Sequence, residues 1–113
     1  GLLDTPKRVA KAMMFAASGY SKCVTKELGS AVFSEESVSL GKEFSNVVLV
    51  RDIEFHSTHE ADLMPFYGRV HVAYVPKNGK VIGLSKFARI TEVLARRLQS
   101  PDRLAAELAE ELN

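Results

Sequence analysis

The sequence predicts an α+β fold in which amphipathic helices cover a small sheet. Residues 46–56 and 67–75 are typical of strands, because the first stretch is rich in β-branched residues and the second alternates apolar with polar side chains. Residues 6–18, 85–98 and 101–112 instead repeat apolar side chains at helical spacing. A chain of 113 residues with this content fits one domain.

The N-terminal part consists of one helix and a linker. Thr5 followed by Pro6 is typical of a helix start, since a hydroxyl residue favours the N-cap and proline the first helical position. Gly19 is the expected stop of this helix. Residues 20–43 are mixed and polar, so we expect a linker there, with some helix near residues 22–31.

Residues 44–113 hold the strands and two further helices. Residues 78–79 (Asn-Gly) predict a tight turn before the short apolar piece at 81–82. Ser85 is the expected N-cap of the next helix, and Ser100, which precedes a proline, is the expected N-cap of the last one.

The two predicted strands are too few for a stable sheet. An isolated hairpin is marginal in water, and two amphipathic helices need a wider sheet to cover. We therefore expect further strands from beyond Asn113, from partner subunits, or from both. Because the chain opens on Gly1 and stops within a helical pattern, we interpret it as a fragment that lacks C-terminal strands.

Charge and composition exclude several classes of protein. Lys and Arg number 15 and Asp and Glu 14, so the net charge of +1 argues against a nucleic-acid partner. The sequence contains no apolar run of the roughly 20 residues that span a bilayer, and we expect no membrane partner. A single cysteine, Cys23, excludes an internal disulfide and predicts a reducing compartment such as the cytoplasm.

Residues 56–62 gather possible metal ligands between the two predicted strands. His56, His59, Glu60 and Asp62 offer imidazole and carboxylate groups, which bind zinc or iron, and strand ends are common places for sites. A solvated polar loop explains the same residues.

Ser85, Lys86 and Arg89, which we call the phosphate cluster, lie at the predicted start of a helix. Helix N-terminal amides favour anions, and a hydroxyl, an ammonium and a guanidinium add donors for phosphate oxygens. The alternative is an N-cap followed by a solvated basic face.

Two other helix starts carry charged residues. Lys7, Arg8 and Lys11 lie in the first turns of the N-terminal helix, where the macrodipole disfavours cations, so either a bound anion or a plain surface helix is possible. Asp102, in the first turn of the last helix, either complements the dipole or accepts hydrogen bonds from a guanine edge.

Four stretches together resemble the GTP cyclohydrolase I family. The resemblance covers nearly the whole chain and implies the tunnelling fold (T-fold), an antiparallel sheet with two helices on one face. It also implies a homo-oligomer, a toroidal decamer with active sites between subunits, and C-terminal strands that are absent here. The stretches are Leu-Asp-Thr-Pro-Lys-Arg-Val-Ala-Lys at 3–11, Val-Arg-Asp-Ile-Glu-Phe-His-Ser-Thr at 50–58, Ala-Tyr-Val-Pro at 73–76 with Val-Ile-Gly-Leu-Ser-Lys-Phe-Ala-Arg-Ile at 81–90, and Arg-Arg-Leu-Gln-Ser-Pro-Asp-Arg-Leu at 96–104.

The resemblance implies a substrate, a metal and a reaction. The family opens the imidazole ring of GTP with a zinc-activated water, releases formate and forms 7,8-dihydroneopterin triphosphate, the first step of pterin and folate biosynthesis. It implies that the phosphate cluster binds the triphosphate, with Arg8 and Lys11 assisting from a neighbouring subunit. Asp102 takes the position of the guanine-binding glutamate, one methylene shorter.

The chain departs from the family where the chemistry takes place. Family enzymes have Cys-Glu-His-His where this chain has His59, Glu60, Ala61 and Asp62. His59 and Asp62 replace two zinc ligands and can still bind metal, whereas Ala61 replaces the catalytic histidine and cannot move a proton. His56 and His71 are conceivable substitutes.

Two interpretations compete. The chain is either part of an active or variant GTP cyclohydrolase I, or a non-catalytic homologue that keeps assembly and triphosphate binding. The second kind is similar to one half of the tandem-domain plant-type enzymes, in which case a plastid or another reducing compartment is possible. A regulatory subunit that binds a partner protein and no nucleotide is a third class. The altered ligands leave open whether zinc is bound.

Overall fold

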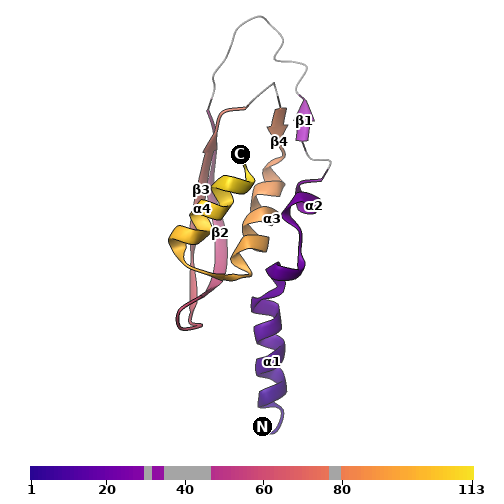
Figure 1. The fold of residues 1–113 in the computed structure, drawn as a ribbon, viewed down its shortest axis with the longest axis vertical. Coiled ribbons are helices and arrows are strands. Elements are labelled where there is room, and N and C mark those ends of the chain that lie inside the picture. Colours follow the sequence, from indigo (N-terminus) through magenta and orange to yellow (C-terminus); the bar gives the residue numbers. More distant parts are fainter. Residues whose placement is uncertain (30–31, 35–46, 77–79) are drawn as a thin grey trace, which may run out of the picture.

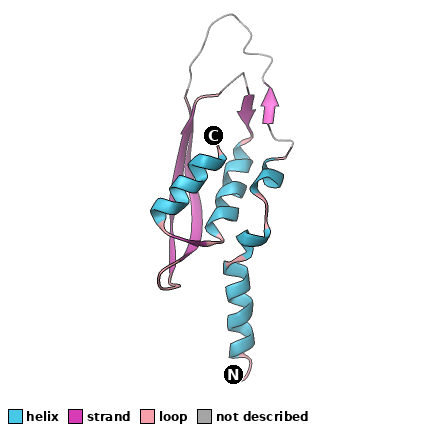
Figure 2. Cartoon of the chain, viewed as in Figure 1, coloured by secondary structure: helices cyan, strands magenta, loops and turns pink. Residues whose placement is uncertain are grey.

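The computed structural model describes residues 1–29, 32–34, 47–76 and 80–113. The fold is α+β, as the sequence predicts, and two of the helices, α3 and α4, cover one side of a small sheet (Figures 1 and 2). The helices are α1 (Thr5–Ala16), the 3-10 helix η1 (Ser18–Ser21), α2 (Val24–Leu28), α3 (Leu84–Ala95) and α4 (Pro101–Glu111). The strands are β1 (Val32–Ser34), β2 (Val48–His59), β3 (Pro65–Tyr74), β4 (Lys80–Ile82) and β5 (Leu98–Gln99).

The main sheet is a long hairpin with a short third strand, in the order β3–β2–β5. β2 and β3 are antiparallel. β5 pairs with β2 in parallel, with Thr58 opposite Leu98 and His59 opposite Gln99. The sheet is therefore mixed, because the chain leaving α3 runs beside the end of β2 before α4 begins.

A second sheet lies where we expected a linker. β1 pairs antiparallel with β4, which contains the apolar piece at 81–82. α2 lies within residues 22–31, where we expected some helix, and that expectation is confirmed. The stretch 20–43 also holds β1 and the end of η1, which are too short to produce a periodic pattern. The predicted turn at 78–79 and residues 35–46 lie outside the described part of the chain.

A β-bulge divides β2 into two halves. The register shifts between Val50 and Ile53, and Asp52 has a φ of 60°. The Asp52 N–H donates to Nδ1 of His71 at 3.1 Å. Because the extra residue reverses the alternation, Val50 and Ile53 both face the helices.

The core forms where α3 and α4 pack on this face of the sheet. Ile90 and Leu94 of α3 and Leu104 of α4 are almost fully buried, and Val70 of β3 packs against them. The hydroxyl of Ser57 donates to the carbonyl oxygen of Ala95 at 2.7 Å, which fixes β2 against the end of α3. The predicted placement of two helices on one face is confirmed (Figure 1).

The helix boundaries agree with the prediction at some ends and differ at others. Ser100 accepts a hydrogen bond from the Arg103 N–H at 3.3 Å and caps α4, as predicted. The expected N-cap at Ser85 is wrong, because α3 begins at Leu84 and Gly83 occupies the N-cap position. The first helix ends at Ala16, earlier than expected, and η1 follows it.

Gly19 lets η1 pack closely against the end of α3, and it is not the stop of a helix. It is buried within η1, and its N–H donates to the carbonyl oxygen of Arg96 at 2.8 Å. A Cβ at this position would overlap the carbonyl oxygen of Val93 and lie 2.8 Å from that of Arg96. Neighbouring Tyr20 accepts a hydrogen bond from the Leu98 N–H at 3.1 Å, so η1 is held on the end of α3.

We predict that Gly19→Ala destabilises the chain by about 2–4 kcal/mol, because the new methyl group must push two backbone carbonyls apart. Urea denaturation measures this loss. Gly1→Ala is the matched control, since a Cβ there meets no atom within 4 Å. Equal stability of the two variants would contradict the close packing at η1.

Candidate functional site

The segment at residues 56–62 belongs partly to a strand and not only to a loop as predicted. His56 and His59 are in β2, and the turn begins at Glu60. The turn is closed by hydrogen bonds from the His59 N–H to the Met64 carbonyl oxygen at 2.8 Å and from the Leu63 N–H to the His59 carbonyl oxygen at 2.9 Å. Long strands therefore leave only a few residues of this segment free to form a site.

His59 and Asp62 lie close together, and each side chain accepts a hydrogen bond from a backbone N–H. Nδ1 of His59 is 3.9 Å from Oδ1 of Asp62. The same nitrogen accepts a hydrogen bond from the Ala61 N–H at 3.2 Å, and Oδ1 of Asp62 accepts one from the Met64 N–H at 3.0 Å. A neutral His59 ring that accepts at Nδ1 carries its proton on Nε2 and has no free lone pair for a metal.

The residues at this turn do not fit a zinc site. Zinc in a catalytic site takes about three protein ligands, and no group of three His, Cys, Asp or Glu side chains suited to a metal occurs within the described ranges. His59 and Asp62 supply two, and His59 must first give up the hydrogen bond from the Ala61 N–H. We therefore derive no step through a metal at this turn.

The histidines that could replace the missing catalytic one are engaged elsewhere. His56 stacks on Tyr67 of β3, with ring centroids 5.9 Å apart and planes at 24°. His71 accepts from the backbone of the bulge. Ala61 offers only a methyl group, so the described turn has no side chain in the position of the family's proton-transfer residue.

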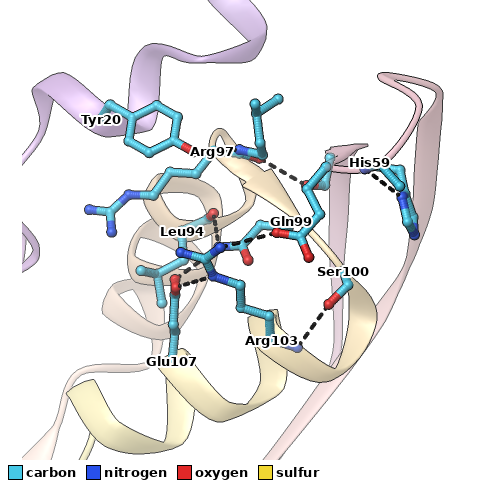
Figure 3. A network of polar contacts seen from close by, with 12 residues as sticks. Tyr20, His59, Leu94, Arg97, Gln99, Ser100, Arg103 and Glu107 are labelled. Carbon is cyan, nitrogen blue, oxygen red and sulfur yellow. Dashed lines mark hydrogen bonds and ion pairs between the residues drawn. The ribbon is translucent and has the colours of Figure 1, made fainter.

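A polar network that the sequence did not suggest joins the turn to α4 (Figure 3). Glu60 is the member of this network that lies in the turn. Its carboxylate is 3.0 Å from Nη1 of Arg103, and its N–H donates to the Gln99 carbonyl oxygen at 2.9 Å. Nε of Arg103 donates to Glu107 at 2.9 Å. The amide Nε2 of buried Gln99 donates to Glu107 at 2.9 Å and to the Leu94 carbonyl oxygen at 3.0 Å. Glu60 and Arg103 thus hold the turn in place.

The network shifts the pKa values of two of its members. Burial alone raises the pKa of Glu107, but the hydrogen bonds from Gln99 and Arg103 and the charge of Arg103 outweigh it, and the pKa is lowered. The hydrogen bonds to Glu107 and Glu60 raise the pKa of Arg103 above its ordinary value. The charged forms of both groups are therefore favoured in the folded chain.

The phosphate cluster is at the start of α3, next to β4. Ser85 and Arg89 are exposed, whereas Lys86 is half-buried. Positions one, three and four residues apart on a helix span about 100° of its circumference, so the three residues share one side of α3. Nζ of Lys86 donates to the carbonyl oxygen of Glu27 in α2 at 2.8 Å.

The other predicted site residues lie far from the phosphate cluster. Asp102 is exposed in the first turn of α4, beside the end of α3 that is opposite the cluster (Figure 1). Arg8 and Lys11 are exposed on α1, which extends away from the rest of the chain, and Nη1 of Arg8 donates to the Gly1 carbonyl oxygen at 3.4 Å. One copy of the chain does not bring these residues together.

Comparison with known proteins decides the family. The family model described as GTP cyclohydrolase I matches residues 1–113. The chain belongs to the GTP cyclohydrolase I family. "GTP cyclohydrolase 1 2" from Nostoc sp. is 49% identical over 112 residues, which cover 99% of this chain and 48% of that protein.

Other members of the GTP cyclohydrolase I family show the same relation. "GTP cyclohydrolase 1 2" from Pseudomonas aeruginosa is 48% identical over 110 residues, 97% of this chain and 56% of that protein. "GTP cyclohydrolase 1" from Campylobacter jejuni is 49% identical over 112 residues, 99% of this chain and 55% of that protein. The chain thus spans about half the length of the curated relatives it matches.

The resemblance inferred from the four sequence stretches is confirmed at the level of the GTP cyclohydrolase I family, and the α+β arrangement agrees with its T-fold. None of the helices in the described residues is both long and apolar enough to cross a membrane.

We predict that Glu107 makes the free energy of unfolding of the chain depend on pH in the acidic range. A carboxylate whose pKa is lowered on folding stabilises the folded state above the ordinary pKa of a glutamate, and this contribution is lost as the pH falls through the lowered pKa. Urea denaturation from about pH 5 downward should show a steeper loss for the native chain than for Glu107→Gln. Glu111→Gln, an exposed change on the same helix, should keep the native slope. Equal slopes for the native chain and Glu107→Gln would contradict the assigned network.

Proposed function

We propose that this chain binds GTP as part of a GTP cyclohydrolase I, which opens the imidazole ring of GTP, releases formate and yields 7,8-dihydroneopterin triphosphate. The observation that carries the proposal is the phosphate cluster on the first turn of α3, in a chain that belongs to this family throughout its length. The GTP cyclohydrolase 1 names of the relatives support the same activity.

The phosphate cluster would hold the triphosphate through charge-assisted hydrogen bonds. Arg89 offers a planar guanidinium, Lys86 an ammonium and Ser85 a hydroxyl, and the amides at the start of a helix of 12 residues add partial positive charge. Anchoring the triphosphate fixes the position of the base at the other end of the nucleotide. Asp102 would accept hydrogen bonds from the N1–H and the 2-amino group of guanine.

The distance between these groups favours a site shared by two copies of the chain. Ser85 is at the start of α3, Asp102 is in the first turn of α4 beside the other end of α3, and 12 helical residues are about 18 Å long (Figure 1). We therefore propose a homo-oligomer in which one copy supplies the phosphate cluster and a neighbour supplies Asp102. Exposed apolar residues on and before α1 give such an assembly surface to bury: Leu2, Leu3, Val9, Met14 and Phe15. The decamer implied by the family remains part of this proposal.

The turn after β2 favours a second function, that of a non-catalytic homologue. Ala61 cannot transfer a proton, and His59 and Asp62 are held by backbone N–H groups. A chain of this kind would keep triphosphate binding and assembly but would not open the ring. The two functions share the phosphate cluster and differ only in what this turn does.

We predict that Lys86→Ala and Arg89→Ala each weaken GTP binding about tenfold or more, because each removes a charge-assisted hydrogen bond to phosphate. Isothermal titration calorimetry measures the Kd. Lys22→Ala and Arg51→Ala remove exposed cations of the same kinds elsewhere on the chain and should leave the Kd within about twofold. An unchanged Kd in both cluster variants would refute the phosphate cluster.

We predict little or no formate release from GTP by the 113-residue chain alone, because Ala61 offers no group for proton transfer. Quantifying formate after incubation with GTP tests this. Catalytic release of formate would overturn the non-catalytic interpretation.

Elemental analysis separates the alternatives further, since stoichiometric zinc or iron that is lost in His59→Ala or Asp62→Ala would favour a variant enzyme.

A further inference from the structure

Lys86 differs from its neighbours in the phosphate cluster because the fold already holds its side chain. Ser85 and Arg89 are exposed, but the Lys86 ammonium donates to the carbonyl oxygen of Glu27 at 2.8 Å. Glu27 is near the end of α2, a helix of five residues. The last carbonyls of a helix have no partner within it, and a lysine ammonium there satisfies one of them.

The core fixes the position of this carbonyl. Val24, the first residue of α2, is 4% exposed and belongs to the same core as Ile90 and Leu94 of α3. Leu28, the last residue of α2, packs against that core as well. Gly29 follows with a φ of 40°, and its N–H donates to the carbonyl oxygen of Thr25. The end of α2 is therefore held beside the first turn of α3.

We propose that α2 is a positioning element for the triphosphate site, in which the Glu27 carbonyl orders the Lys86 side chain before GTP binds. The proposal rests on the proposed function. An ammonium has three N–H donors, so one bond to Glu27 leaves two for phosphate oxygens. Lysine has much rotamer freedom to lose on binding, and a side chain that is already ordered loses less of it.

A pair of matched core variants tests this coupling in the full chain. Val24 and Val93 are each 4% exposed in the same core, but Val24 belongs to α2 and Val93 to α3. We expect Val24→Ala to raise the Kd for GTP about fivefold and Val93→Ala to change it less than about twofold. An equal effect of the two substitutions would overturn the proposal.

A double-mutant cycle assigns the effect to Lys86. In a Lys86→Met background, Val24→Ala should change the Kd less than about twofold, because the ammonium that α2 orders is gone. In an Arg89→Ala background, Val24→Ala should keep its full effect. A full effect of Val24→Ala in the Lys86→Met background would overturn the proposal.

Hydrogen exchange gives a readout that needs no core substitution. Lys86→Met removes the partner of the Glu27 carbonyl, so the amides of α2 should exchange severalfold faster without GTP, whereas Arg89→Ala should leave them unchanged. Unaltered exchange in Lys86→Met would refute the positioning role alone. If neither Lys86→Met nor Arg89→Ala changes the Kd for GTP, the proposed function fails and this inference fails with it.

Discussion

Burial of one face of α3 is the constraint on which the rest of the structure depends. Phe87, Ile90 and Leu94 are almost fully buried, and they hold α3 between the sheet, α4 and the N-terminal elements. η1 and α2 both dock on α3, the first at its end through Gly19 and the second nearer its start. The residues of the proposed function are positioned relative to this helix. The phosphate cluster is in the first turn of α3, and the altered segment after β2 lies beyond the C-terminal end of α3.

The long elements could be predicted from the sequence because their patterns repeat over many residues. The strand alternation around Val70 and the cap at Ser100 led directly to β3 and α4. The elements that the sequence missed, such as β1 and β5, have two or three residues each and form only because longer elements present a partner. The predicted N-cap at Ser85 is two residues late, because Gly83 occupies the N-cap position and the hydroxyl residue lies inside the helix.

The candidate site was only partly predictable for the same physical reason. Residue types at the start of α3 indicated phosphate chemistry, but a contact such as Lys86 with a backbone carbonyl of α2 depends on tertiary packing and leaves no local signal. The network of Glu60, Arg103 and Glu107 joins Glu60 to an ion pair of α4 that begins 43 residues farther along the chain. Sequence comparison could identify the altered residues of the turn, whereas only the structure reveals that His59 and Asp62 have backbone partners.

The bulge in β2 limits how this chain can change during evolution. Strand residues normally alternate between the two faces of a sheet, and the additional residue at Asp52 resets that alternation once. Loss of a single residue at the bulge would restore regular alternation and leave Val50 and Ile53 on the same face, whereas loss of a residue between Ile53 and Ser57 would turn Ser57 toward solvent. A one-residue deletion in β2 is therefore tolerated at the bulge and not in the half of the strand that follows it, so relatives can lack the bulge and still share this core.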